Sequence, residues 1–140
     1  MTQSSKTIRH NESARQVGKA WWRWLLVLVY AVSIFILSAL PGDRFPAFHV
    51  SDKFLHAAEF GVLSFLLCRA LHAQKPTRAK WMTMGLSILV AIGYGVTDEA
   101  HQLLVSKRVG DLADLLADSL GAVGAAWVWN KAGTRWPWIQ

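Results

Sequence analysis

Residues 21–40 read WWRWLLVLVYAVSIFILSAL, a run of twenty residues whose single charge is Arg23. About twenty apolar residues let a helix cross the roughly 30 Å hydrocarbon core of a bilayer. The turn signal Pro41-Gly42-Asp43 follows, and three more apolar runs come later, at 54–71, 81–97 and 112–129. The sequence therefore predicts an all-α integral membrane protein, a bundle of four transmembrane helices. A cleavable signal peptide is the alternative for the first run, but the run exceeds the roughly 7 to 15 apolar residues usual there.

The composition also favours a membrane protein. Of the 140 residues 53% are hydrophobic and 17% are charged. The formal net charge is +6, but the basic residues fall between the apolar runs, so nucleic acid is not an expected partner. The single cysteine, Cys68, allows no intramolecular disulfide. We expect a basic cytoplasmic segment at 1–20, a transmembrane domain at 21–130 and a cytoplasmic tail at 131–140.

The basic residues and the tryptophans predict the orientation. Eight basic residues precede or open the first run or connect the second run to the third, whereas the other two connections carry four. Because Lys and Arg concentrate in cytoplasmic loops, both termini are expected in the cytoplasm. All eight tryptophans fall at the start of the first run, the start of the third, or the end of the fourth and its tail. In an up-and-down bundle these places lie on the same face of the membrane, which predicts a tryptophan belt at the cytoplasmic interface.

Seven of the nine acidic residues lie within or beside the apolar runs. In the predicted orientation all seven lie at the outer face, on three helix ends. Asp52, His56 and Glu59 are spaced i, i+4, i+7 and share one stripe of a helix. An acidic side chain inside a bilayer is costly and indicates a functional site. We therefore expect one polar, ligand-binding pocket formed by Asp52, Lys53, His56, Glu59, Asp98, Glu99, Gln102, Arg108, Asp111, Asp114 and Asp118.

Depth separates these acids into two groups. Glu59 and Asp118 lie about 9 Å inside their runs and are not caps. For the acids at helix ends, helix capping and a functional site explain the position equally well. Those acids are Asp52, Asp98, Glu99 and Asp111.

The charge balance of the pocket gives three hypotheses. Seven acids face three permanent cations, Lys53, Lys107 and Arg108. The excess negative charge calls for protonated carboxyls, a bound cation or a cationic ligand. The hypotheses are a divalent cation, a proton relay, or recognition of an amine-bearing ligand. The candidate metal ligands are His56, Asp98, Asp114 and Asp118. If the protein is an enzyme, the catalytic candidates are His56, Glu59, Asp98 and Asp114.

Small residues recur every four positions along the fourth run, at Ala113, Ala117, Gly121 and Ala125. This pattern lets membrane helices approach closely. The seam lies about 100° from the acidic stripe, so one face can pack while the next lines the pocket. We expect packing within the chain, and a homodimer seam is the alternative.

Several blocks of the sequence resemble the VanZ-like family. The blocks are Ser38-Ala39-Leu40-Pro41, Asp52-Lys53-Phe54-Leu55-His56 with Glu59-Phe60, Asp98-Glu99-Ala100-His101-Gln102, and Arg108 with Asp111, Asp114, Asp118 and Gly121. By resemblance, Asp52, Lys53 and His56 match the family's DKxxH block, Asp98, Glu99 and Gln102 its DExxQ block, Arg108 its downstream arginine, and Asp114 and Gly121 its last block. The chain departs from the family pattern at Asp118, where many members have Asn, and at Ser106-Lys107, where Pro-Gly is common.

The resemblance implies a small multi-pass protein of the bacterial inner membrane. The family's namesake is associated with low-level resistance to the lipoglycopeptide teicoplanin. We expect the outward-facing pocket to bind a membrane lipid, a lipid-linked envelope precursor or a lipoglycopeptide. Lys53 and Arg108 would contact a phosphate, and the carboxylates an amine. The alternative is a membrane-embedded, metal-dependent hydrolase or transferase acting on an envelope lipid. A transporter ranks third, because no continuous polar path crosses the bundle.

Overall fold

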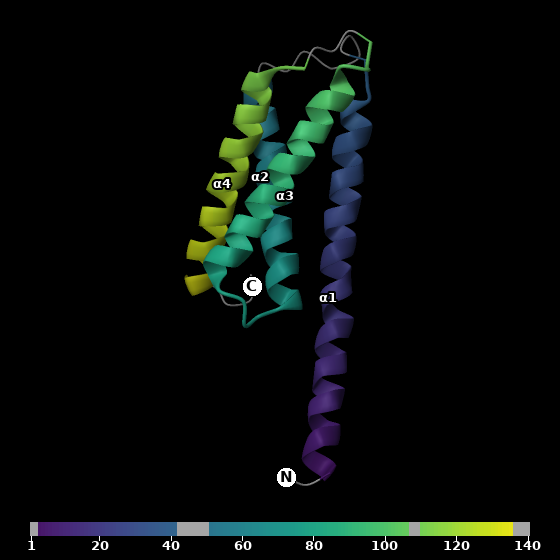
Figure 1. Ribbon diagram of the computed structural model, residues 1–140, viewed down its shortest axis with the longest axis vertical. Coiled ribbons are helices and arrows are strands. Elements are labelled where there is room, and N and C mark those ends of the chain that lie inside the picture. The colour runs from purple at the N-terminus through teal and green to yellow at the C-terminus, as the bar shows by residue number, and fades with distance from the viewer. Residues whose placement is uncertain (1–2, 42–50, 107–109, 136–140) are drawn as a thin grey trace.

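The structure is a computed structural model and describes residues 3–41, 51–106 and 110–135. These residues form four helices and no strand: α1 (Gln3–Ser38), α2 (Asp52–Gln74), α3 (Lys80–Gln102) and α4 (Leu112–Arg135). The all-α prediction is confirmed. In Figure 1, α2, α3 and α4 form a bundle with the second half of α1, while the first half of α1 continues beyond it.

The helices are longer than the apolar runs that predict them. Much of the expected basic segment 1–20 is helical, because α1 begins at Gln3. α3 continues past Thr97 to Gln102, through the sequence DEAHQ, in which Glu, Ala and Gln favour helix. α4 extends into the expected tail at 131–140 and ends at Arg135. The continuation of α3 adds a polar turn to the helix end that carries Asp98.

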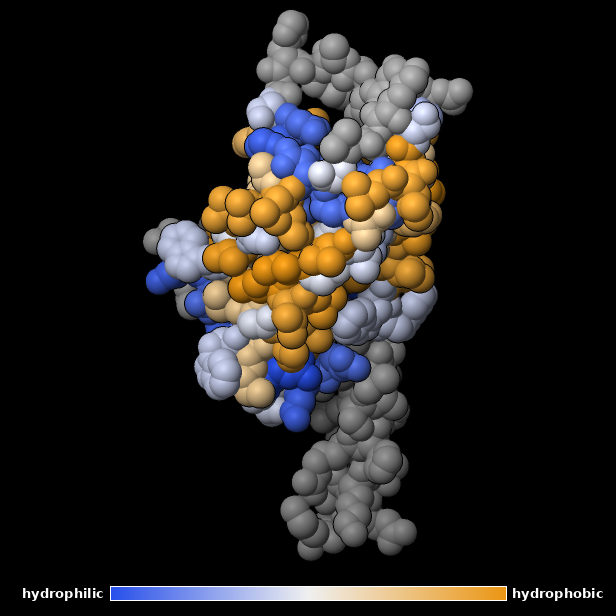
Figure 2. Space-filling view, turned by 45° about the horizontal axis from the view of Figure 1, so that its top comes forward, coloured by the Kyte–Doolittle hydropathy of each residue, from blue (hydrophilic) through white to orange (hydrophobic). Residues whose placement is uncertain are grey.

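Three of the described helices are long and apolar enough to cross a membrane. The segments are Trp21–Ser38 of α1, Asp52–Gln74 and Leu112–Gly133. α3 is as long as α2, at 23 residues each, but is not one of the three. On the face that Figure 2 shows, hydrophobic residues cover the middle of the coloured surface, and hydrophilic residues lie toward its two ends. These features are those of a membrane protein.

Close packing of α2 against α4 sets the geometry of the bundle. A Cβ atom added to Gly121 would overlap the carbonyl group of Ala57, so the two backbones meet directly at this point. One turn further along, a Cβ on Gly61 would lie 3.7 Å from the Ala125 Cβ. The Ser64 hydroxyl donates to the Ala122 carbonyl oxygen over 2.9 Å across the same contact. Gly121 and Ala125 of the small-residue seam thus pack within the chain, as expected of close membrane helices.

The remaining helices pack around α2 through apolar side chains. Phe60, Leu63 and Leu67 of α2 belong to a buried cluster that also includes Ile34 of α1. α3 is joined to α1 by the Tyr94 hydroxyl, which donates to the Ala31 carbonyl oxygen over 2.7 Å. α1 therefore belongs to the bundle and contributes one of its walls.

The tryptophans do not all fit the predicted interfacial belt. Trp81 and Trp127 are more than half exposed, as residues at a membrane surface are expected to be. Trp129 is buried, and its ring lies 5.5 Å from the His72 ring, edge to face. The belt prediction is therefore wrong for Trp129, whose position on α4 faces the core. Trp136 and Trp138 lie outside the described residues.

Candidate functional site

Three helix ends meet at one end of the bundle and carry the polar residues. The start of α2, the end of α3 and the start of α4 lie together at the top of Figure 1. This arrangement follows from the chain order, because neighbouring helices of the bundle run in opposite directions. The sites predicted on three separate runs therefore share one region. Arg108 lies outside the described residues.

Lys53 links α2 to the start of α4. Its ammonium lies 2.9 Å from Asp111 Oδ2 and 2.9 Å from Asp114 Oδ1. The Lys53 ammonium holds the pKa of the Asp111 carboxyl below its usual value, together with the Ala113 backbone N–H that Asp111 also accepts. Asp111 therefore serves both as a helix cap and as an ion-pair partner. Lys53 was expected to contact a phosphate, but in the structure its charge is neutralised by these two carboxylates.

His56 and Asp118 form a buried pair between α2 and α4. His56 Nδ1 lies 3.0 Å from Asp118 Oδ1, and a single proton joins the two atoms. Asp118 is entirely buried, and no hydrogen-bond donor among the described residues reaches its Oδ2. A Cβ on Gly95 would lie 3.0 Å from that oxygen, so α3 closes over it. A buried carboxylate oxygen without a partner is costly unless something supplies positive charge.

The end of α3 brings two further carboxyls beside this pair. Asp98 Oδ2 accepts a hydrogen bond from the Gln102 amide over 2.9 Å, and Asp98 Oδ1 has no partner among the described residues. Glu99 Oε2 accepts the backbone N–H of Asp111 over 2.8 Å, which ties α3 to the start of α4. Glu99 Oε1 also lacks a partner within the described part of the chain. Three buried carboxylate oxygens at this end, including Asp118 Oδ2, are thus unpaired.

A pocket of about 30 Å³ opens beside these residues. Its polar wall comes from α2 and α3 and its apolar wall chiefly from α1. The described lining residues include no lysine or arginine, and they are Ile34, Leu37, Ser38, Asp52, Leu55, His56, Glu59, Asp98 and Gln102. Lys53, Glu99, Asp111, Asp114 and Asp118 lie beside this lining and not in it.

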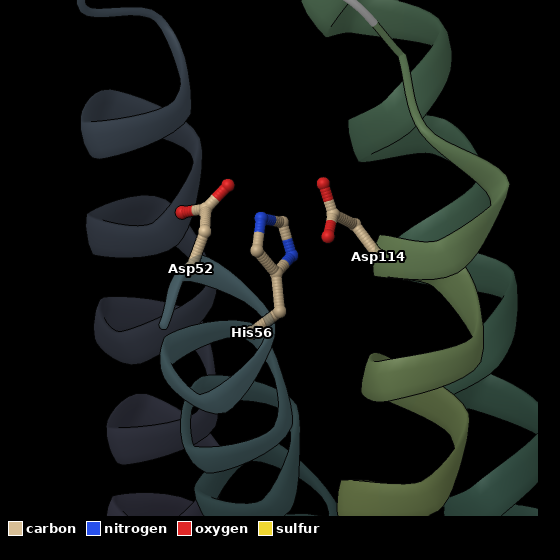
Figure 3. Close-up of side chains that lie close together, drawn as sticks. All are labelled: Asp52, His56 and Asp114. Atoms are coloured by element: carbon tan, nitrogen blue, oxygen red, sulfur yellow. The ribbon is translucent and has the colours of Figure 1, made fainter. Parts of the chain in front are cut away.

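Two groups of side chains could hold a metal ion, and His56 belongs to both. In the outer group the His56 ring lies between the carboxylates of Asp52 and Asp114 (Figure 3). The inner group combines His56 with Glu99 and Asp118. Within each group the ligand atoms lie within 4.8 Å of one another. Asp98, a predicted metal ligand, belongs to neither of these groups.

The contribution of α1 to the pocket is absent from the residues predicted from sequence. Ile34, Leu37 and Ser38 line the pocket, and the buried Ser38 hydroxyl has no partner among the described residues. The charge pattern gives no sign of them, because the last part of α1, from Tyr30 to Ser38, carries no ionisable residue but Tyr30. Ser38 does begin the first block of the family resemblance, which could have identified it.

Comparison with known proteins identifies the family. A family model described as VanZ/LLP1 matches residues 2–133, nearly the whole chain. No curated protein matches the chain, and no solved structure matches it either. The match includes all four helices and every helix end that carries the site. The chain therefore belongs to the VanZ/LLP1 family of proteins.

Proposed function

We propose that this VanZ-family protein crosses the bacterial inner membrane four times, with both termini in the cytoplasm and the pocket facing outward. α2 and α4 run in the same direction along the bundle in Figure 1, and α3, which lies between them in the sequence, runs in the opposite direction. If α2 and α4 both cross the membrane in the same direction, the chain must cross back once between them. α3 is the helix that connects them in the sequence. The excess of basic residues on the proposed inner segments supports the orientation.

We propose that the pocket binds the amine group of an envelope amphiphile. The supporting observation is the charge of its lining, in which Asp52, Glu59 and Asp98 are accompanied by no lysine or arginine among the described residues. Neither the Asp52 nor the Glu59 carboxylate forms a hydrogen bond with another described residue. A volume of about 30 Å³ has room for a water-sized group, and an ammonium group has that size and the required charge. Charge-assisted hydrogen bonds would then hold the amine.

The apolar wall of the pocket supports an amphiphile over a soluble amine. Ile34 and Leu37 line the pocket from α1; Ile34 is buried in the core, and Leu37 is 42% exposed at the surface. A hydrocarbon chain beside Leu37 would remain in the bilayer while the amine enters the pocket. Aminophospholipids, lipid-linked envelope precursors and lipoglycopeptides can each present an amine and a hydrocarbon chain. Lys53 is held by Asp111 and Asp114, so this proposal assigns recognition to the carboxylates and not to a phosphate contact.

Lipid binding to the purified full-length chain in detergent tests this proposal. The probes are phosphatidylethanolamine and phosphatidylglycerol with the same fluorescent acyl chain, so that they differ only in the headgroup, and only the ethanolamine headgroup carries an amine. We expect phosphatidylethanolamine to bind about ten-fold more tightly, the value of one charge-assisted hydrogen bond. Glu59→Gln should remove most of that preference. Asp111→Asn is the matched control because Asp111 does not line the pocket, and it should keep the preference. Equal affinity for both lipids would refute the amine proposal.

The His56–Asp118 pair favours a second candidate function, a hydrolase or transferase acting on the same lipid. A carboxylate that holds Nδ1 fixes the tautomer and leaves Nε2 as a general base. Incubation of envelope phospholipids with the purified chain, followed by mass spectrometry, would reveal released headgroup or acyl products. Turnover that His56→Gln abolishes would support the enzyme, and absence of products with the wild type would eliminate it.

A further inference from the structure

The structure assigns a divalent transition-metal site to His56, Glu99 and Asp118. The three ligands come from α2, α3 and α4, and their ligand atoms lie within 4.8 Å of one another. This inner group lies beside the proposed amine pocket and is independent of which lipid, if any, enters it. Glu99 and Asp118 do not line the pocket.

The unpaired oxygens of this group point to a cation. Asp118 is entirely buried, yet its Oδ2 has no donor among the described residues, and the same holds for Glu99 Oε1. Two donors near these oxygens, among the described residues, are already engaged. Lys53 is bonded to Asp111 and Asp114, and the Gln102 amide is bonded to Asp98. Two carboxylates and a neutral imidazole carry a charge of −2, which a divalent cation balances.

The spacing of the donors fits a metal of small radius. Zn²⁺ binds nitrogen and carboxylate oxygen at about 2.0–2.2 Å, so two ligands in a tetrahedral site lie about 3.3 Å apart. His56 Nδ1 and Asp118 Oδ1 already lie 3.0 Å apart. The ion would replace the proton that joins them, the Asp118 carboxylate would bind through both oxygens so that Oδ2 also gains a partner, and Glu99 would close the site after a side-chain adjustment. Glu99 is only partly buried, so it leaves an approach from the aqueous side.

The donor set also indicates the class of ion. An imidazole with two carboxylates suits Zn²⁺ or Mn²⁺, whereas Mg²⁺ prefers a set made entirely of oxygen donors. Three protein ligands leave at least one coordination position for water or a ligand group. A site of this kind would cross-link three helices at the outer end of the bundle.

Metal titration of the metal-free, tag-free full chain in detergent tests the assignment, and no lipid is needed. Isothermal titration calorimetry should give one Zn²⁺ ion per chain, and Mg²⁺ should not compete for the site. In a separate melting experiment Zn²⁺ should raise the thermal midpoint of unfolding. Glu99→Gln and Asp118→Asn preserve side-chain volume and should each weaken Zn²⁺ binding at least about ten-fold. Glu99→Gln keeps an oxygen acceptor for the Asp111 N–H, so it remains decisive if the Asp118 variant does not fold.

Two matched variants test whether Zn²⁺ binding depends on the inner group and not on other acids nearby. Asp111→Asn removes an exposed acid from the same end, and Asp52→Asn removes a ligand of the outer group only. Both variants should leave the Zn²⁺ affinity within about three-fold of the wild type. Absence of saturable Zn²⁺ binding would overturn the assignment. Binding that Glu99→Gln leaves unchanged, or that Asp52→Asn abolishes, would equally do so.

Discussion

Gly121→Ala should separate the two helices that position the site. The added Cβ would lie 2.8 Å from the Ala57 Cα and overlap the Ala57 carbonyl group, and all of these neighbouring atoms are backbone. No rotamer change relieves such an overlap, so α2 and α4 must move apart. Overpacking a close contact costs about 1–3 kcal/mol, and a contact between backbones belongs at the upper end. His56 and Asp118 lie beside this contact, so their 3.0 Å hydrogen bond should lengthen as well.

Gly124→Ala is the matched control for this prediction. A Cβ at Gly124 meets no heavy atom within 4 Å, and alanine should favour the helix by about 0.5–1 kcal/mol. Unfolding of both variants by SDS in mixed micelles, followed by far-ultraviolet circular dichroism, gives the difference in free energy of unfolding. We expect Gly121→Ala to be less stable than Gly124→Ala by at least about 2 kcal/mol. Equal stabilities would refute the direct backbone contact and the site geometry that depends on it.

Three further predictions concern topology, pH and resistance. A reporter that is active only outside the cytoplasm should be active when fused after Arg44 and inactive when fused after Gln74; the opposite pattern would reverse the proposed orientation. Lys53 lowers the pKa of Asp111 in the folded chain, so their ion pair stabilises the fold above the ordinary value of 3.8 and is lost as the pH falls through the lowered value. Lys53→Met should therefore show a smaller fall of the thermal midpoint in acid, and an unchanged fall would show that the pair adds nothing. Deletion of the gene should increase teicoplanin susceptibility, with restoration by the wild type but not by Glu59→Gln; unchanged susceptibility on deletion would remove a resistance role.

Helical periodicity predicts much of the polar end of the bundle. The spacing of Asp52, His56 and Glu59 specifies one stripe of a helix, and these three residues do line the same pocket. The apolar runs predict the four helices, although they underestimate their length. Helix propensity and capping extend a helix into polar sequence, as in α3 beyond Thr97.

The partners of individual side chains depend on distances between helices, which the sequence does not contain. Lys53 pairs with Asp111 and Asp114 because α2 and α4 approach closely at Gly121. For the same reason Asp118 meets His56, whereas Asp98 bonds Gln102, four residues along its own helix, at a spacing that the sequence does contain. The wall formed by Ile34 and Leu37 could not be recognised, because in a sequence an apolar residue that faces a pocket looks the same as one that faces lipid.

The sequence also does not tell whether a tryptophan near a helix end is buried in the bundle or exposed at its surface. Trp129 lies near a helix end, as interfacial tryptophans do, but it faces the core of the bundle. Trp127, two residues earlier, is exposed. On a helix a shift of two residues turns a side chain by about 200°, so composition near a helix end cannot separate the two environments.

The central claim, an outward-facing pocket that favours cations, is tested most directly by cysteine labelling in intact cells. The only native cysteine, Cys68, is buried and can be replaced by serine. In that background Ser38→Cys places a thiol in the pocket and keeps all its carboxylates, and Gln74→Cys places one at the end of α2 away from the pocket. We predict that membrane-impermeant methanethiosulfonate reagents label Ser38→Cys but not Gln74→Cys, and that a cationic reagent reacts faster with Ser38→Cys than an anionic one of similar size. Labelling of Ser38→Cys only after permeabilisation, or faster reaction with the anionic reagent, would contradict the account.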